Sequence, residues 1–280
     1  MAATGKAALD DSVFAAIVES QVVQELRPAM TSREFLRFAT GGSSTVATFP
    51  LWTDPGPATA PASDITDLSS TAMADTKQQA TAAEIGFRID ISDVIRETHP
   101  TNLYAEAAAM VVRSLVEKWE TDLAALMDDF SNVTTAASTL TGIDVLAAVS
   151  ALEQRDIPGP YVGYLDPKQT GELRAEIATT TASYAVGRDG EKVTPFGTSG
   201  YFGTYMGLPI WQTSTVVATS GLNGGSVFCS GQALGAYEIW GPRVETQRDA
   251  SLRAMEFNGT ACYGFVEIDD TRGQTVKSVS

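Results

Sequence analysis

A long segment without glycine or proline, residues 102–130, constrains the fold more than any other part of the chain. It follows Pro100 and Thr101, and a threonine in that place is suited to cap the start of a helix. Its apolar residues recur at steps of three and four, which predicts one stripe along an α-helix. The stripe consists of Tyr104, Ala108, Val111, Leu115, Trp119, Leu123, Leu126 and Phe130.

The charged residues of this segment, Glu120 among them, fall mostly off the stripe. We therefore expect a one-sided helix of roughly 45 Å, a spine against which a sheet packs. The stripe lacks strict heptads, so a coiled coil is the weaker alternative.

Composition and charge exclude several classes of protein. The chain has 280 residues, of which 44% are hydrophobic, enough for one large or two small domains with a real core. Its 34 acidic and 19 basic residues give a net charge of −15, which argues against binding nucleic acid through a basic face. No apolar run approaches the roughly 20 residues of a membrane span, and Asp10 and Asp11 interrupt the place of a signal peptide's apolar stretch.

Two cysteines, Cys229 and Cys262, stand far apart in strand-like sequence. We expect buried free thiols, with a disulfide as the alternative. A chain with no CxxC and a single histidine is unsuited to a zinc site. The low cysteine count is typical of a protein made in a reducing cytoplasm.

The first third of the chain alternates between ordered and loose patterns. Residues 8–26 space Phe14, Val18, Val22 and Leu26 by four, which predicts an amphipathic helix on an N-terminal arm. The helix could dock on its own core or on a neighbouring molecule, and the pattern leaves both open.

Residues 45–52 are extended and apolar, with Pro50 typical of an edge strand. Residues 53–83 hold few large apolar groups, Ile65, Leu68 and Met73, and cannot build a core. Residues 84–95 then alternate apolar side chains on one face, as a strand does. We expect a long projecting hairpin whose two flanks are 45–52 and 84–95. Such a long excursion is usually functional or disordered.

The second half predicts helices first and antiparallel strands later, an α+β chain. After a loop at 131–142, a helix begins near Thr141 or Asp144. Its expected buried face consists of Ile143, Leu146, Val149 and Leu152. A strand at 161–165 leads to a helix with Asp166 as cap and Pro167 at its first position. A strand at 208–217 follows, and then short strands at roughly ten-residue spacing, separated by glycine turns.

No set of residues predicts catalysis, and we expect no catalytic residue, metal or cofactor. The only histidine, His99, has no GxSxG partner motif and is better placed to cap a helix or lie at the surface. The acidic pairs 10–11, 128–129 and 269–270 and the turn at 187–191 lack the spaced ligands of a calcium loop. The glycines of 197–207 lack the lysine and spacing of a phosphate cradle. The aromatic residues Tyr237, Trp240, Tyr263 and Phe265 could stack bases, but strand-core packing is favoured in so acidic a chain.

Four stretches, taken in order, resemble the major capsid proteins of tailed bacteriophages, whose fold is shared with encapsulin shells and the floor of herpesvirus capsids. They are the hairpin-to-spine segment 84–127, YVGYLDPKQTGELR (161–174), GTYMGLPIWQTSTV (203–216) and the terminal strands 233–268. The resemblance covers nearly the whole chain, and its specificity lies in the order of the stretches.

By this resemblance the chain is α+β, with an N-terminal arm (1–45), an extended β-hairpin loop (46–96) and two further domains. The peripheral domain takes 97–136, with the spine helix, and 241–280; the mixed axial domain takes 137–240. The implied function is structural: hexamers and pentamers of the chain close an icosahedral shell around viral DNA, which they enclose without tight binding. The chain is then a virion capsid protein, made and assembled in the host cytoplasm, with separate scaffolding, portal and decoration proteins as partners.

Contacts between subunits are expected from the arm and the extended loop. The candidate residues are Phe14, Val18, Val22, Pro50, Trp52, Ile65, Leu68 and Lys77. Lys77 is the only lysine of the loop, and nothing in the sequence supports a crosslink through it. Two alternatives stay open: an encapsulin-like nanocompartment that packages an enzyme, and a monomeric acidic binding module that grips a ligand with its 53–83 loop.

Overall fold

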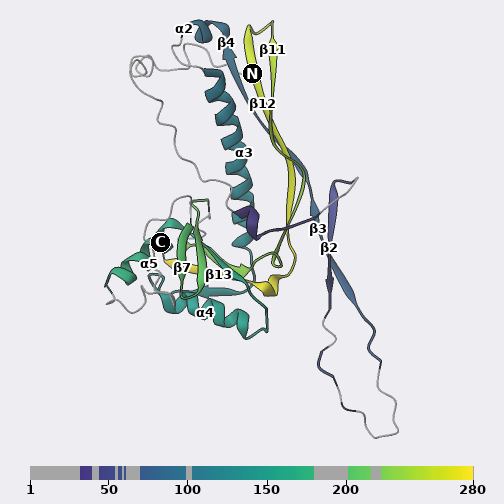
Figure 1. The fold of residues 1–280 in the computed structure, drawn as a ribbon, viewed down its shortest axis with the longest axis vertical. Coiled ribbons are helices and arrows are strands. Elements are labelled where there is room, and N and C mark those ends of the chain that lie inside the picture. The colour runs from purple at the N-terminus through teal and green to yellow at the C-terminus, as the bar shows by residue number, and fades with distance from the viewer. Residues whose placement is uncertain are drawn as a thin grey trace.

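The computed structural model describes residues 32–39, 44–53, 56–58, 60, 70–98, 103–179, 201–215 and 222–279. The predicted arm helix with Phe14, Val18 and Val22, and the loop residues Ile65 and Leu68, lie outside these ranges. Figure 1 shows a long helix beside a long strand ribbon, a second sheet with its own helices, and a hairpin that projects away from both.

The spine helix is confirmed as α3, Leu103–Met127. It packs on a four-stranded sheet with the strand order β1-β11-β12-β4. Their bounds are β1 Arg37–Phe38, β11 Leu234–Asp249, β12 Ala254–Glu267 and β4 Ala83–Ser92. A short helix, α2 Asp93–Thr98, follows β4.

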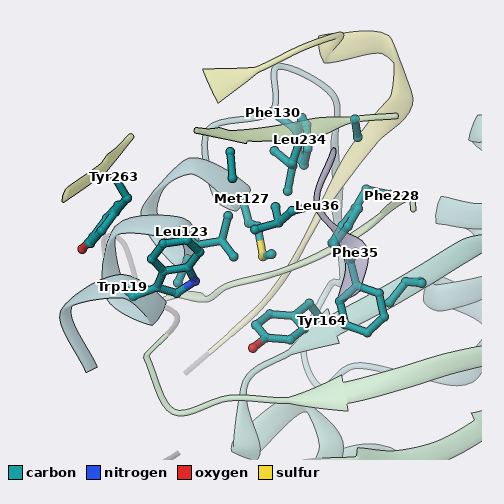
Figure 2. Packing of buried hydrophobic residues seen from close by; sticks show 14 of the residues in the cluster. Phe35, Leu36, Trp119, Leu123, Met127, Phe130, Tyr164, Phe228, Leu234 and Tyr263 are labelled. Atoms are coloured by element: carbon teal, nitrogen blue, oxygen red, sulfur yellow. The ribbon is translucent and has the colours of Figure 1, made fainter. Parts of the chain in front are cut away.

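The predicted apolar stripe of α3 faces this sheet. Trp119 is 1% exposed, and its ring centroid lies 4.6 Å from that of Tyr263 and 4.7 Å from that of Phe265. Figure 2 shows Trp119 and Leu123 pointing from the helix into a cluster that also holds Phe35 and Tyr164. Phe130 lies beyond the helix end and is buried in the same cluster, so the apolar stripe continues past the end of the helix.

Glu120 departs from the expected exposed face of the spine. Its side chain is 1% exposed and accepts hydrogen bonds from the Ser32 hydroxyl at 2.8 Å and the Tyr164 hydroxyl at 2.9 Å. Ser32 begins a short 3-10 helix, η2 Ser32–Phe35, and Tyr164 belongs to the second sheet. The carboxylate therefore joins the end of the arm, the spine and the second sheet, a contact that the stripe pattern gave no reason to expect.

The second sheet has seven strands in the order β5-β13-β10-β6-β8-β7, with β9 paired to β13. The strands are β5 Val133–Thr135, β6 Tyr161–Leu165, β7 Tyr201–Tyr205, β8 Leu208–Gln212, β9 Leu222–Asn223, β10 Gly225–Cys229 and β13 Gly273–Val279. Its helices are α4 Gly142–Glu153 and α5 Pro167–Thr179. As predicted, Asp166 caps α5, where its carboxylate accepts from the backbone N–H of Lys168 at 2.7 Å.

The predicted buried face of α4 is only partly right. Leu152 is buried and Val149 is partly buried, as expected, but Ile143 is 75% exposed and Leu146 40% exposed, and Val145 and Ala148 are buried in their place. Apolar residues stand on both sides of the helix, so their spacing could not choose the buried side. Contacts at its start choose it: Gly142 donates its N–H to Glu176 at 2.6 Å, and a Cβ on Gly142 would overlap the ring of Tyr205.

The expected short strands are present as β10 and β13, but β11 and β12 are longer, single strands of 16 and 14 residues paired along their length. The register of β11 shifts between Glu238 and Trp240 and again between Trp240 and Arg243, around Gly241. This glycine marks a bulge where a turn was expected. Gly259, within β12, allows α3 to approach, since a Cβ there would overlap the side chain of Val111.

The projecting hairpin has a different pairing from the predicted one. β2, Val46–Trp52, pairs with β3, Asp75–Thr81, while β4 pairs with β12. The second flank therefore comes from the polar stretch DTKQQAT, inside the range expected to be loose. Only Ala80 of this strand is buried, so backbone hydrogen bonds to β2 define it more than apolar burial does.

Two smaller predictions are confirmed. Cys229 and Cys262 are free and buried. Tyr237 and Tyr263 are buried in the core clusters, with Trp240 and Phe265 partly buried against them, so these aromatic residues pack between elements as expected.

Candidate functional site

The described ranges offer no centre for metal chemistry, because no group of three or more histidine, cysteine, aspartate or glutamate side chains is placed to hold a metal ion. Nor is any helix among these residues long and apolar enough to span a bilayer. The features that remain are surfaces, and the projecting hairpin presents the most distinct of them.

The hairpin has an inner face that ties it to its own chain. Ala47, Phe49 and Ala80 are buried there, in a cluster with Tyr237 and Ile268. The Phe49 ring reaches so close to β11 that a Cβ on Gly235 would lie 2.9 Å from its Cζ. The Tyr237 hydroxyl also donates to the carbonyl of Ser44 at 2.8 Å, at the base of the hairpin. The root of the hairpin is therefore fixed by packing.

The outer face of the hairpin carries three of the predicted contact residues. Pro50 lies opposite Lys77, and Trp52 lies opposite Asp75. Because directly opposed residues of an antiparallel pair share a face, and successive residues alternate, these four side chains lie on the side away from Phe49. Trp52 is 64% exposed. We call this surface, made by Pro50, Trp52, Asp75 and Lys77, the outer face.

The outer face combines the features of a contact surface. A tryptophan is among the residues that contribute most to binding when an interface buries it. Lys77 is exposed, and no described acidic residue forms an ion pair with it. It is also the only cationic residue of the sequence from 46 to 87. The sequence named these residues by position in the loop; their shared face became visible only with the pairing of β2 and β3.

A second surface lies where α3 meets β12. An open hollow of about 410 Å³ is lined by Asp122, Ala125, Leu126, Asp129, Tyr263, Gly264 and Phe265. The Tyr263 hydroxyl donates to the Asp122 carboxylate at 3.0 Å, and Lys118 forms an ion pair with the same carboxylate. Burial, with the negative charge of Asp122, raises the pKa of Tyr263, which stays neutral. Sequence reasoning missed this hollow, because its lining comes from two distant segments.

Carboxylates crowd the edge of the hollow at Asp129. Glu267, at the end of β12, has a pKa raised to about 7, first by burial, then by a hydrogen bond to Asp270 and by the charges of Asp270, Asp129 and Asp269. These residues lie where α3 and β12 end and the chain crosses to the second sheet through η3, Asp270–Arg272. The crossing is held by a hydrogen bond of 2.7 Å from the Ser131 N–H to Asp270 Oδ1. Asp269 pairs with Arg272 at 2.8 Å, so the carboxylates of this cluster that have no described cationic partner are those of Glu267, Asp270 and Asp129.

Comparisons with known proteins agree with this architecture. Residues 75–275 match the family described as phage capsid protein. A solved structure from Mycobacterium phage Che8 is similar, with a TM-score of 0.72 and 15% identity over 93% of this chain and 95% of that chain. The capsid of Ralstonia phage GP4 has a TM-score of 0.72 and 9% identity over 94% of this chain and 96% of that chain.

An encapsulin complex from Synechococcus elongatus PCC 7942 is also similar, with a TM-score of 0.67 and 11% identity over 97% of this chain and 96% of that chain. The search of curated proteins finds no match. At these identities the structural likeness shows the fold alone, and the predicted α+β phage major-capsid fold is confirmed.

Proposed function

The chain belongs to the phage capsid protein family and is a structural, non-enzymatic protein of the virion capsid; on this premise we propose that its hexamers and pentamers close an icosahedral shell around viral DNA. The observation that carries the proposal is the outer face of the hairpin. An exposed tryptophan and a lysine without a described acidic partner, held out on a rooted hairpin, are suited to a contact with another subunit.

The division into domains remains part of the proposal. The arm would take 1–45, the extended loop 46–96, the peripheral domain 97–136 with 241–280, and the axial domain 137–240. One observation favours a change at the end of the chain. β13 pairs with β10 and β5 in the seven-stranded sheet, so residues 273–279 belong more naturally with the axial domain.

The charge of the chain supports a shell that encloses DNA without binding it tightly. A net charge of −15 leaves few cations to neutralise phosphates, so the DNA would be confined by the closed wall. Scaffolding, portal and decoration proteins would then be separate partners, and assembly would take place in the host cytoplasm.

An encapsulin-like nanocompartment is the second candidate function, favoured by the similar fold of the encapsulin complex. The two candidates differ in cargo, a genome against an enzyme. A monomeric binding module remains the third, and it would need no contact between copies.

Negative-stain microscopy and light scattering of the purified protein test assembly, with and without a scaffolding protein expressed beside it. We expect capsomers or closed shells. Particles from infected cells should contain nuclease-protected DNA, whereas particles filled with one enzyme and no DNA would favour the nanocompartment. A compact 29.6 kDa monomer under every condition would contradict both assemblies.

A further inference from the structure

We propose that the joint between the two units of the subunit is a proton-controlled clasp: a proton shared by Glu267 and Asp270 fixes the angle between the units, and its loss frees that angle. The first unit is α3 with the four-stranded sheet, and the second is the seven-stranded sheet with α4 and α5. The inference goes beyond the proposed function, because it concerns the single subunit and holds whether or not the chain assembles.

The joint is the place where the chain passes between the two units. It does so in the segments 128–132, 230–233 and 268–272, which link α3 to β5, β10 to β11 and β12 to β13. Figure 1 shows the second sheet beside the C-terminal end of α3. A Cβ on Gly273 would overlap the ring of Phe130, so the first and third segments run in close contact as they enter the second unit.

Hydrogen bonds tie these segments to one another. The Ser131 N–H donates to Asp270 Oδ1 at 2.7 Å, and the Asn132 side chain donates to the Asp270 carbonyl at 3.4 Å, so the third segment holds the first. The Ile268 N–H donates to the Ala233 carbonyl at 2.8 Å, which holds the third segment to the second. Asp270 is therefore the residue that fastens the exit from α3.

These polar bonds determine the angle between the units more than the apolar contacts do. The cluster that both units share holds Trp119 and Leu123 of the first unit with Val162 and Phe228 of the second. Apolar burial has no preferred direction, so it tolerates a small rotation of one unit on the other. A hydrogen bond needs its donor and acceptor in line, and so the bonds to Asp270 restrict that rotation.

Glu267 makes this tie sensitive to protons. Its side chain lies at the end of β12, is half-buried and is hydrogen-bonded to Asp270; its pKa is raised to about 7, first by burial and then by that bond and the neighbouring carboxylates. When Glu267 is protonated it donates to Asp270, and the pair carries a single negative charge. When the proton leaves to solvent, the two carboxylates repel each other, which weakens the hold of Asp270 on Ser131.

The charged groups around Glu267 do not offset this repulsion. Asp129, at the end of α3, and Asp269, on η3, add negative charge. Arg272, the cation of η3, pairs with Asp269 at 2.8 Å. The residue of β11 opposite Glu267 is the apolar Leu234.

Two cations of the second unit that reach the joint have partners of their own. Lys277 on β13 forms an ion pair with Asp128 at 3.4 Å. Arg155, which follows α4, donates to the Thr271 carbonyl at 2.8 Å and to a side chain of β13. Across the described ranges, no cation forms an ion pair with Glu267 or Asp270, so the shared proton is what joins them.

Hydrogen exchange of the Ser131 amide in the unassembled subunit measures the clasp directly, because this N–H exchanges when its bond to Asp270 opens. The protonated share of Glu267 falls about tenfold between about pH 6 and about pH 8. After correction for the intrinsic effect of pH on exchange, the protection of Ser131 should fall by about five- to tenfold over that range. The Lys168 amide, which donates to the Asp166 carboxylate at 2.7 Å in the second unit, is the internal control and should keep its protection.

Two variants remove one charge of the pair by different routes. Glu267→Gln can still donate to Asp270 but cannot ionise, and Asp270→Asn can still accept from Ser131 but does not repel a charged Glu267. Both should hold the protection of Ser131 nearly constant over the same pH range. Glu153→Gln, which removes a negative charge from the exposed end of α4, is the matched control and should retain the wild-type fall. A fall that persists in either joint variant, or that is absent from the wild type, would overturn the proposal.

Distance measurements between two spin labels, one on each unit, report the angle itself. Ala105 on α3 and Ser150 on α4 are exposed, whereas the native Cys229 and Cys262 are buried, so labels can be attached at Ala105→Cys and Ser150→Cys. The distance distribution should be narrow at about pH 6 and broader at about pH 8, and it should stay narrow at both values once Glu267→Gln is added. A distribution that does not change with pH would show that the proton does not control the angle, and the clasp would be refuted.

Discussion

The spine helix and the projecting hairpin are both extended elements, yet different interactions hold them in place. α3 buries Val111, Leu115, Trp119 and Leu123 against the four-stranded sheet of its own chain. The hairpin buries Phe49 and two alanines of its strands at its root, while its outer face stays exposed. Contacts within one subunit therefore determine the position of the spine helix. They bury only the inner face of the hairpin, and its outer face remains available for a contact with another molecule.

The largest difference in subunit stability should come from Trp119→Ala. Truncating this ring, which is 1% exposed between Tyr263 and Phe265, should lower the free energy of unfolding by about 3–5 kcal/mol. Urea denaturation of the unassembled subunit measures the change. An unchanged midpoint of denaturation would mean that the apolar stripe of α3 does not stabilise the subunit. The helix would then not differ from the hairpin in the way proposed above.

A smaller effect is expected at Gly259, where β12 passes beneath α3. An alanine Cβ there would overlap Val111 and force helix and strand apart, at a cost of about 1–3 kcal/mol. Gly86→Ala on the adjacent strand β4 is the matched control, because its Cβ would find its nearest neighbour, the Gly259 carbonyl oxygen, at an ordinary 3.5 Å. Equal melting temperatures for the two variants would show that the spine does not depend on this close approach.

The same contrast explains how much of the molecule the sequence could predict. The spine followed from its periodicity, and α5 followed from Asp166 and Pro167, because local chemistry and burial agree there. The face of α4 followed only in part, because apolar residues stand on both sides of the helix and contacts from Tyr205 and Glu176 select its orientation. Strand β3 has a single apolar residue, Ala80, so its sequence contains no alternating apolar pattern that would predict its pairing with β2.

The candidate contact surfaces were only partly predictable, for a related reason. Pro50, Trp52 and Lys77 were identified by their place in the loop, but that they share one face depends on the register of β2 with β3. The hollow depends on residues more than 130 positions apart, Asp129 and Tyr263 among them, which only the packing of α3 on β12 brings together. Both the outer face and the hollow depend on contacts between distant segments, and such contacts leave no local pattern in the sequence.

Glu267 should give the unassembled subunit a pH dependence of intermediate size. Its pKa is about 7 in the folded chain against an ordinary 4.5, so between these values the folded state binds more protons than the unfolded state. Stability should therefore fall as pH rises from about 5 to about 7.5. Because the side chain is only half-buried, solvent screening reduces the loss to roughly 1–2 kcal/mol.

Glu267→Gln tests this dependence, since it removes the ionisable group while keeping a similar shape. The variant should gain stability relative to the wild type at pH 8 but not at pH 5, as measured by denaturation at both values. If the pH profiles of the two proteins run parallel, the pKa of Glu267 is not raised by its burial and by the carboxylates of Asp270, Asp129 and Asp269.

The smallest effect on subunit stability should come from Trp52→Ala, and it tests the comparison most directly. Trp52 is 64% exposed on the outer face, so its removal should change the free energy of unfolding by no more than about 0.5 kcal/mol. Phe49→Ala is the control three positions away on the same strand: Phe49 is 2% exposed on the inner face, and its loss should cost about 3–5 kcal/mol. Assembly, in contrast, should be strongly weakened by Trp52→Ala. A tryptophan that is buried only at a subunit contact contributes nothing to the stability of the free chain but much to the contact. Denaturation of the subunit and microscopy of the shells, run on the same preparations, separate the two roles. A Trp52→Ala protein that forms shells at the wild-type concentration would show that the outer face is bare surface, and a marked loss of subunit stability would show that it is already covered within its own chain.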